Sequence, residues 1–464
     1  MKNFRQSWTA INKEIQDAQL SVAGWLLLLL CASLQFISSL PHAIALRKLF
    51  LLIAFLLSLK YFWEGLRKES KLLPVVALLF ATLQLWMLVI SGFISSQPAD
   101  SFLTWKGQWL PALMAFIAGL GLAYTLMRSN LKNPAATAVL SILIPITAFL
   151  CVNALDLING WIQAGGYIPG QAGIGDHRGV AGYLVALLEP ILIADLLSRL
   201  VKGNRLLPVP VWAVSGLLLF AIVTLIATTN RNGIVGMILT FILCAMIMIP
   251  ELRRVYSAKR VFIFVLATLA FLSATALISY KIDSRWQTFT ETIPIAWDID
   301  HDLLWLNGND PGTAPFTPSG KQVDMSEYSR IAWAHEGWRM LMQHPWGMEI
   351  ARDTFRKLEL EKYGHAGMSH SHNSWIDFGL NVGIPGLILW GSFLFLLARF
   401  AWQAWRMRKE PLGLALAVLI IMFAIRGLLD SIFRDHELEQ FLLVAGLLFG
   451  ALYFQESRFP SKQN

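Results

Sequence analysis

Residues 208–249, PVPVWAVSGLLLFAIVTLIATTNRNGIVGMILTFILCAMIMI, decide the fold of this chain. Two apolar runs, 208–229 and 233–249, flank a short polar turn that contains Arg231. A run of about 20 apolar residues lets a helix cross the roughly 30 Å hydrocarbon core of a bilayer. The stretch therefore predicts two membrane-spanning helices joined by a tight turn, with an arginine held at the membrane surface.

The same pattern recurs along nearly the whole chain. Of its 464 residues, 56% are hydrophobic and 15% are charged, and the mean hydropathy is +0.55, whereas soluble domains carry about 25% charged residues. This composition excludes a water-soluble fold and predicts an all-α polytopic membrane protein of about twelve transmembrane helices. The other ten expected spans are 20–40, 44–63, 72–94, 110–127, 135–158, 180–200, 261–280, 375–398, 412–429 and 438–454.

Positive charges are distributed unevenly over the connections between these spans. Lys and Arg gather on alternate connections, for example at Arg253, Arg254, Lys259 and Arg260. Because such residues favour the cytoplasmic side of a membrane, we expect both termini to be cytoplasmic. This distribution also accounts for the net charge of +8 without nucleic-acid binding, since no basic stripe interleaved with stacking aromatic side chains is present.

One long connection, residues 281–373, falls on the opposite side of the membrane. It divides the chain into nine spans (1–280), a loop subdomain and three further spans (374–464). A connection of this length is too large to serve only as a link between two helices. We therefore expect the functional site on this non-cytoplasmic side.

The long loop has two parts of different character. Residues 297–326 are rich in Asp, Gly, Pro and Asn and are expected to be irregular. Apolar residues then recur at three-to-four spacing from Tyr328 to Met342, which predicts an amphipathic helix, and a second short helix is expected over 349–362. We expect both helices to lie along the membrane surface over a lipid substrate.

Four arginines stand on the outer side of this topology, against the prevailing charge distribution. They are Arg178 at the start of the sixth span, Arg231 in the turn, Arg330 in the first loop helix and Arg426 inside the eleventh span. A guanidinium group offers phosphate oxygens a planar fork of donors at any physiological pH, so converging arginines can form a diphosphate site without a metal. The alternatives are structural: an ion pair of Arg426 with Asp430, capping or an ion pair with Asp176 for Arg178, and an ordinary turn residue for Arg231.

A histidine cluster, Ser369-His-Ser-His-Asn-Ser374, precedes the tenth span. Either His370 or His372 can accept a proton from an attacking hydroxyl near neutral pH, and Asn373 can orient that histidine or the substrate. One alternative is a metal site that also uses His365, although no H-E-x-x-H pattern is present. The other is a plain interfacial loop.

Several of these motifs occur together in one known family. They are the Thr-Asn-Arg turn at Arg231, the helix start Ser329-Arg330, the segment His344-Pro345-Trp-Gly347, and His372-Asn373 leading into Leu380-Asn-Val-Gly-Ile-Pro-Gly386. Over about 178–430 the chain resembles the O-antigen ligase and polymerase superfamily of bacterial envelope glycosyltransferases, and most of all the O-antigen ligases. The insertion at 298–321 has no counterpart in that pattern.

The resemblance implies a glycosyltransferase C-type membrane fold in the bacterial inner membrane, with a periplasmic active site under an outer loop. The donor would be a glycan on undecaprenyl diphosphate and the acceptor lipid A-core, with no metal or other cofactor and with inversion at the anomeric carbon. By this resemblance Arg231 and Arg330 hold the diphosphate and His372 is the catalytic base. The further substrate-binding residues expected are Arg178, His370, Asn373 and Arg426.

Other functions fit the same sequence less well. The superfamily also contains O-antigen or exopolysaccharide polymerases and protein O-oligosaccharyltransferases, which use the same kind of donor. A transporter is the alternative from a different class, because Glu189, Arg426 and Asp430 are ionisable residues within or beside predicted spans. However, no inverted repeat is evident and the largest polar segment lies on one side only. We therefore rank the ligase first and the polymerase second.

Overall fold

The computed structural model of the protein describes residues 20–67, 71–168, 170–175, 179–202, 204–301, 303–307, 312 and 314–456. Within these residues the chain is helical, and the only β-type pairing is an isolated bridge between Phe316 and Gln322. The all-α fold expected from composition is confirmed.

Among the described residues, ten helical segments are long and apolar enough to cross a membrane. Two shorter apolar helices, α2 (Val22–Ile37) and α9 (Val211–Ala227), bring the total to the twelve that the sequence predicts. The long segments are α3 (Ile44–Leu66), α4 (Leu72–Val89) with the π-helical turn Ile90–Ile94, α5 (Pro98–Thr104) continuous with the π-helical turn Trp105–Trp109 and α6 (Leu110–Arg128), α7 (Pro134–Ala164), α8 (Gly179–Lys202), α10 (Arg231–Val255), α11 (Ala258–Ile282), α15 (Ser374–Arg408), α16 (Pro411–Leu429) and α17 (Asp435–Glu456).

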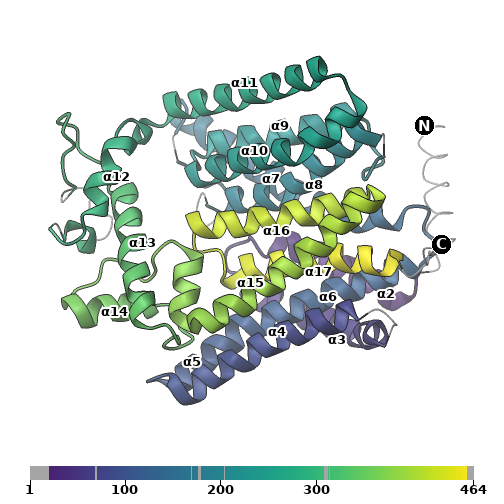
Figure 1. Ribbon diagram of the computed structural model, residues 1–464, viewed down its shortest axis with the longest axis horizontal. Helices are drawn as coiled ribbons and strands as arrows, with labels where there is room; N and C mark the ends of the chain where they lie inside the picture. Colours follow the sequence, from purple (N-terminus) through teal and green to yellow (C-terminus); the bar gives the residue numbers. More distant parts are fainter. Residues whose placement is uncertain are drawn as a thin grey trace.

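These helices run side by side as a bundle, with α11 along one edge and α3 and α4 along the other (Figure 1). The spans in α6, α8 and α17 are the most buried, whereas those in α3 and α11 are mostly exposed. Because lipid tails are as apolar as leucine, an exposed apolar span is stable only when the bilayer surrounds it. The bundle therefore has the architecture of a multi-pass membrane protein.

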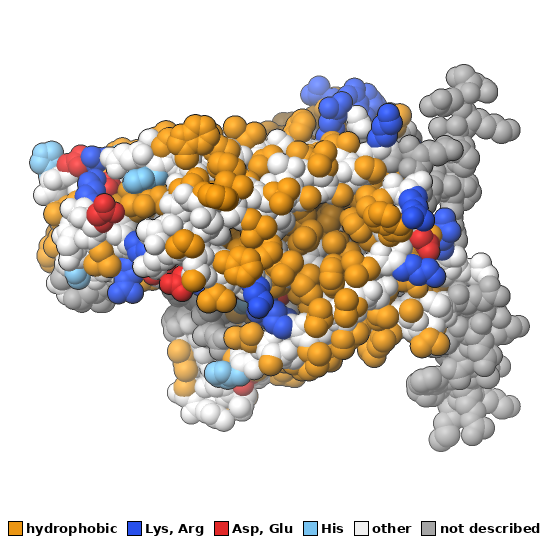
Figure 2. All heavy atoms as spheres, turned by 90° about the horizontal axis from the view of Figure 1, so that it is seen from below, with side chains coloured by type: hydrophobic (Ala, Val, Ile, Leu, Met, Phe, Trp, Pro, Cys, Tyr) orange, Lys and Arg blue, Asp and Glu red, His pale blue; other side chains and the backbone are white. Residues whose placement is uncertain are grey.

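The surface is consistent with this arrangement. Figure 2 shows hydrophobic side chains covering the middle of one face, while Lys and Arg side chains gather at the end away from the loop helices. The opposite end carries a mixture of acidic, basic and histidine side chains. The two ends of the bundle therefore differ in chemistry, and the mixed end is the one that holds the long loop.

The long loop forms a compact layer across one end of the bundle. Its helices are α12 (Phe289–Trp297), α13 (Met325–Gln343) and α14 (Thr354–Tyr363), with 3₁₀ turns at Ser284–Gln287 and Leu304–Asn307. In Figure 1, α13 runs across the ends of the bundle helices. Buried Trp305, Tyr328, Trp333 and Phe355 belong to a second hydrophobic core, which continues into the start of α15 through Leu380.

Two details of the loop differ from the prediction. Residues 297–326 contain a 3₁₀ turn and the 316–322 bridge, so this part is not wholly irregular. The second loop helix begins at Thr354 rather than near 349. The preceding backbone is bonded elsewhere, because the Met348 N–H donates to the Leu380 carbonyl and the Ile350 N–H donates to the Ser101 hydroxyl.

The loop layer meets the bundle where α15 is kinked. Gly383 has φ +65° and ψ −175°, which interrupts the helix. The turn that ends in Gly347, itself at φ +83°, lies against this kink, and the Ile384 N–H donates to the Pro345 carbonyl at 2.8 Å. A Cβ at Gly383 would lie 2.5 Å from the Pro345 oxygen, and one at Gly347 would lie 2.6 Å from the Asn381 oxygen. Two facing glycines thus allow backbone to approach backbone.

Candidate functional site

A cavity of about 420 Å³ lies at the loop end of the bundle. Its walls come from the α9–α10 turn, the first turns of α13, the histidine loop before α15 and the segment between α16 and α17. Most of the side chains that line it are polar or charged: Arg231, Asn232, Arg285, Ser326, Arg330, His370, His372, Asp430, Ser431, Arg434, Asp435, His436 and Glu437. Segments separated by up to about 200 residues along the chain meet here.

Four of the seven residues predicted for the site line this one cavity: Arg231, Arg330, His370 and His372. The side chain of Asn373 is instead used as the N-cap of α15, where it accepts from the N–H groups of Trp375 and Ile376. Arg178 lies outside the described residues. The cavity therefore brings together the two arginines and both histidines of the predicted chemistry.

Arg426 is buried in α16 and does not line the cavity. The alternative of an ion pair with Asp430 is wrong: no such pair forms within 4.0 Å, because α16 ends at Leu429 and Asp430 has extended backbone at φ −159° and ψ 161°. Instead an Arg426 N–H points at the Gly182 carbonyl, at 3.5 Å. Arg426 thus contributes positive charge from beneath the site.

Arg231 begins α10 and is surrounded by acidic side chains. Asn230 caps the helix by accepting from the Gly233 N–H at 2.8 Å, which sets the tight turn expected from the sequence. The Arg231 guanidinium contacts Asp324 at 3.0 Å, Asp283 at 3.8 Å and Glu327. Asp324 is the N-cap of α13. This arginine therefore ties the start of the loop helix to the bundle as well as facing the cavity.

Arg285 extends the same charge cluster. Its guanidinium contacts both carboxylate oxygens of Asp283, at 2.7 and 2.5 Å, and an N–H lies 3.3 Å from the Thr229 carbonyl. Burial alone would raise the pKa of Asp283, but the bonds and charges of Arg285 and Arg231 hold it below its ordinary value. The Asp283 carboxylate is therefore ionised. Sequence reasoning missed Arg285 because this residue lies in a stretch without a recognisable motif.

Arg330 differs from Arg231 in its surroundings. It stands in the second turn of α13, lines the cavity, and forms no ion pair within the described part of the chain. Its positive charge acts on His370 and Asp430 across the cavity. An anion entering the cavity would therefore find the Arg330 guanidinium without a carboxylate within 4.0 Å among the described residues, unlike that of Arg231.

His372 is held in a constrained position. Its backbone has φ +56°, in the left-handed region that residues other than glycine rarely occupy. Its ring stacks on Trp333 with centroids 5.6 Å apart, and its Nδ1 lies 3.6 Å from an Asp430 oxygen. Burial alone would raise the pKa of Asp430, but His372 with Arg330 and Arg426 holds it well below its ordinary value. An ionised carboxylate thus faces the imidazole.

His370 has a different environment from His372. Its ring lies 4.3 Å from the His372 ring, and its Nδ1 is 2.8 Å from the Ser369 hydroxyl. Burial, together with the positive charges of Arg434 and Arg330 and the neighbouring His372, lowers the pKa of His370 to about 3. His370 is therefore neutral at physiological pH and a weak proton acceptor.

The histidine loop is fixed by two polar residues of α15, the partly buried Asp377 and the buried Ser374. Asp377 accepts from the backbone and hydroxyl of Ser371 at 2.8 and 2.7 Å and from the Ser431 hydroxyl at 2.6 Å. The Ser374 hydroxyl donates to the Asp430 carbonyl at 2.7 Å and accepts from the Ile432 N–H. These bonds join the histidine loop to the segment after α16, which sets His372 beside Asp430.

Sequence reasoning therefore identified the histidines but not their partners. The sequence offers Asp430 as an ion-pair partner of Arg426 or as part of a transport path, and no motif singles out Arg434. Both line the cavity, and among the described residues the Arg434 guanidinium forms an ion pair with Asp435 alone, at 3.6 Å. Among the residues that the structure describes, no group of three or more His, Cys, Asp or Glu side chains is placed to hold a metal ion.

A comparison with known protein families finds a match over the region that contains most of the candidate site. Residues 216–391 match the model of a family described as O-antigen ligase, which confirms the resemblance found in the sequence. The matched region contains Arg231, Arg330, His370 and His372, whereas Asp430 and Arg434 lie beyond it. None of the curated proteins compared with the chain matches it.

Proposed function

We propose that this chain is an O-antigen ligase, from the premise that its residues 216–391 match the family described as O-antigen ligase. It transfers a polysaccharide from undecaprenyl diphosphate to lipid A-core at the periplasmic face of the inner membrane. The observation that carries this proposal is the meeting of His372, Asp430 and Arg330 in one cavity at the loop end of the bundle.

The arginines suit an anionic leaving group. A polyprenyl diphosphate needs charge stabilisation at the departing oxygen, which oriented cationic donors supply without a nucleotide. We assign the first contact to Arg330, because it has no ion-pair partner within 4.0 Å among the described residues, and a further contact to Arg434, which lines the same cavity. Arg231 and Arg285 line the same cavity, but they form ion pairs with three carboxylates. We therefore assign them two roles: to fix the wall of the cavity and to attract the anion.

The histidines suit proton transfer. The acceptor hydroxyl attacks the anomeric carbon, its proton passes to His372 Nε2, and the bond from that carbon to the diphosphate oxygen breaks as undecaprenyl diphosphate leaves. Because Nδ1 faces the ionised Asp430, Nε2 is the atom open to the cavity, and the carboxylate stabilises the imidazolium that forms. Two features thus favour His372 over His370 as the base: the adjacent carboxylate and the low pKa of His370.

Direct displacement by this route inverts the anomeric centre and uses no metal. The first test measures transfer of an undecaprenyl diphosphate-linked glycan to purified lipid A-core by Arg330→Gln and His372→Gln enzymes. We expect kcat/KM to fall by about 10²–10⁴ in each, the range for losing a charge-stabilising donor or a general base. EDTA should leave turnover of the unmodified enzyme intact.

Arg339→Gln is the matched control, because Arg339 lies on the same helix but pairs with exposed Asp300 outside the cavity. Wild-type turnover by both site variants would overturn the assignment.

Deletion of the gene separates the ligase from the polymerase. Uncapped lipid A-core with polymer still assembled on its carrier supports ligation, whereas cores capped by a single repeat indicate polymerisation instead.

A further inference from the structure

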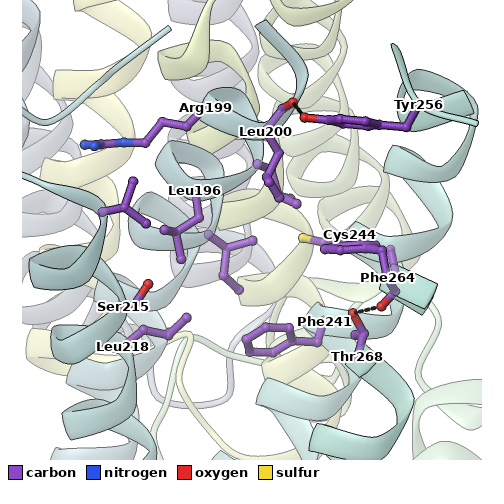
Figure 3. A pocket seen from close by; sticks show the side chains of 14 residues that line it. Leu196, Arg199, Leu200, Ser215, Leu218, Phe241, Cys244, Tyr256, Phe264 and Thr268 are labelled. Atoms are coloured by element: carbon purple, nitrogen blue, oxygen red, sulfur yellow. Dashed lines mark hydrogen bonds between the residues drawn. The ribbon is translucent and has the colours of Figure 1, made fainter. Parts of the chain in front are cut away.

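A second cavity lies in the half of the bundle away from the candidate site. It measures about 480 Å³ and opens between α8, α9, α10 and α11. Figure 3 shows the apolar side chains of Leu196, Leu200, Leu218, Phe241 and Phe264 around it. Its volume falls within the roughly 300–1,000 Å³ of small-molecule sites.

The polar groups around this cavity are largely engaged with protein atoms. The Tyr256 hydroxyl donates to the Leu200 carbonyl at 2.8 Å, and the Thr268 hydroxyl donates to the Phe264 carbonyl at 2.9 Å, both drawn in Figure 3. The Arg199 guanidinium points away from the cavity and is bound to Asp195 at 2.7 Å and to two backbone carbonyls. The interior therefore favours a hydrocarbon occupant over a polar one.

One end of this cavity continues toward a group of basic residues. A smaller cavity of about 240 Å³ shares Leu200, Tyr256 and Phe264 with it and is bordered by Arg260. Arg260 and Lys259 lie in the first turn of α11, are exposed, and form no ion pair within the described residues. An apolar chamber and two uncompensated cations thus lie within reach of one molecule.

We propose that the cavity between α8 and α11 holds an acyl chain of an anionic phospholipid, with the lipid phosphate against Arg260 and Lys259. Transfer of a chain from the bilayer into this cavity exchanges one apolar environment for another, so it gives little selectivity by itself. Basic residues at the ends of spans supply the preference for anionic headgroups. Two such residues correspond to about a five- to thirtyfold preference over a zwitterionic lipid with the same chains.

A third cavity provides an internal comparison. It is larger, about 760 Å³, and more apolar, and its lining residues include no Lys or Arg. Trp86, Trp346 and Ile388 are among its walls, between α4 and the kinked α15. If apolar volume alone selected the lipid, both cavities would take anionic and zwitterionic lipids alike. The proposal predicts headgroup preference only between α8 and α11.

The experiment uses the full-length protein in phosphatidylcholine nanodiscs with a trace of phosphatidylglycerol or phosphatidylcholine that carries a photoactivatable diazirine on one acyl chain. We expect the phosphatidylglycerol probe to label α8 and α10 at least fivefold more than the phosphatidylcholine probe. Ala245→Trp, which fills the cavity, should reduce this labelling at least fivefold. Lys259→Gln with Arg260→Gln should remove the headgroup preference while leaving the basal labelling by phosphatidylcholine.

Ile388→Trp, which fills the third cavity, should leave labelling between α8 and α11 unchanged. If Ala245→Trp is not monodisperse, Thr268→Trp fills the same space. Equal labelling by the two probes would overturn the proposal, as would labelling that persists in the filled variants. Displacement of the probe by undecaprenyl phosphate but not by unlabelled phosphatidylglycerol would assign the cavity to a carrier-lipid tail instead.

Discussion

The chemistry of the candidate site depends on how individual charges are compensated. Arg231 shares its positive charge with three carboxylates, whereas Arg330 has none within 4.0 Å in the described chain. A guanidinium that is already paired must exchange a partner before it binds phosphate, and an unpaired one need not. Two arginines that look equivalent in the sequence therefore differ in readiness for an anion.

Asp430 is the residue on which the assignment of His372 depends most directly. Its carboxylate is ionised and lies 3.6 Å from His372 Nδ1, and this is one of the reasons for which we propose His372 rather than His370 as the base. We expect Asp430→Asn to lower kcat by about 10²–10⁴ while the KM for the donor changes little, because the amide cannot stabilise an imidazolium. Steady-state kinetics of the purified variant measure this split.

The control for that variant is Asp300→Asn, which removes an exposed carboxylate of the loop that pairs with Arg339. It should retain full activity. An Asp430→Asn enzyme with unchanged kcat would show that the carboxylate does not assist the histidine, and the choice of His372 over His370 would then rest on the low pKa of His370 alone.

At the scale of elements, the contact between the His344–Gly347 turn and α15 fixes the position of the loop layer on the helix bundle. Gly383 and Gly347 both have positive φ, and a Cβ on either would enter the other segment's backbone. The Met348 N–H also donates to the Leu380 carbonyl at 3.0 Å across this contact. Since α13 ends immediately before the turn, the contact also sets the position of Arg330 on that helix.

Gly383→Ala should therefore destabilise the protein by about 3 kcal/mol or more, since it combines an unfavourable φ with a backbone clash. Gly391→Ala is the matched control in the same helix, because no atom lies within 4 Å of the added methyl group; it should change stability by less than about 0.5 kcal/mol. Thermal unfolding of the two variants in detergent compares them. Equal melting temperatures would contradict the role of the glycine contact.

At the scale of the whole molecule, the proposed function requires the cavity to face the periplasm. The distribution of Lys and Arg predicts this orientation, because the basic end of the bundle lies opposite the loop layer. In a variant without Cys31, Cys151 and Cys244, Ser319→Cys in the loop should react with a membrane-impermeant maleimide in intact spheroplasts. Ser257→Cys, between α10 and α11, should react only after permeabilisation. The reverse pattern would place the cavity in the cytoplasm and exclude periplasmic transfer.

The sequence by itself was enough to predict the twelve apolar helices, the tight turn at Arg231 and the helix that carries Arg330. Each of these depends on local signals: the length of an apolar run, a capping asparagine or aspartate, and the three-to-four spacing of α13. The histidines could also be identified as candidate site residues from the sequence, because they form a compact motif beside a span.

Only the tertiary structure decided which of these groups act together. The carboxylates around Arg231 lie about 50 to 100 positions away in the chain, and Asp430 is 58 positions from His372. No local periodicity encodes such pairings, because they arise when helix packing brings distant chain segments to the same end of the bundle. The lengths and chemistry of the helices follow from local sequence, whereas the partners of each charge follow from how those helices pack.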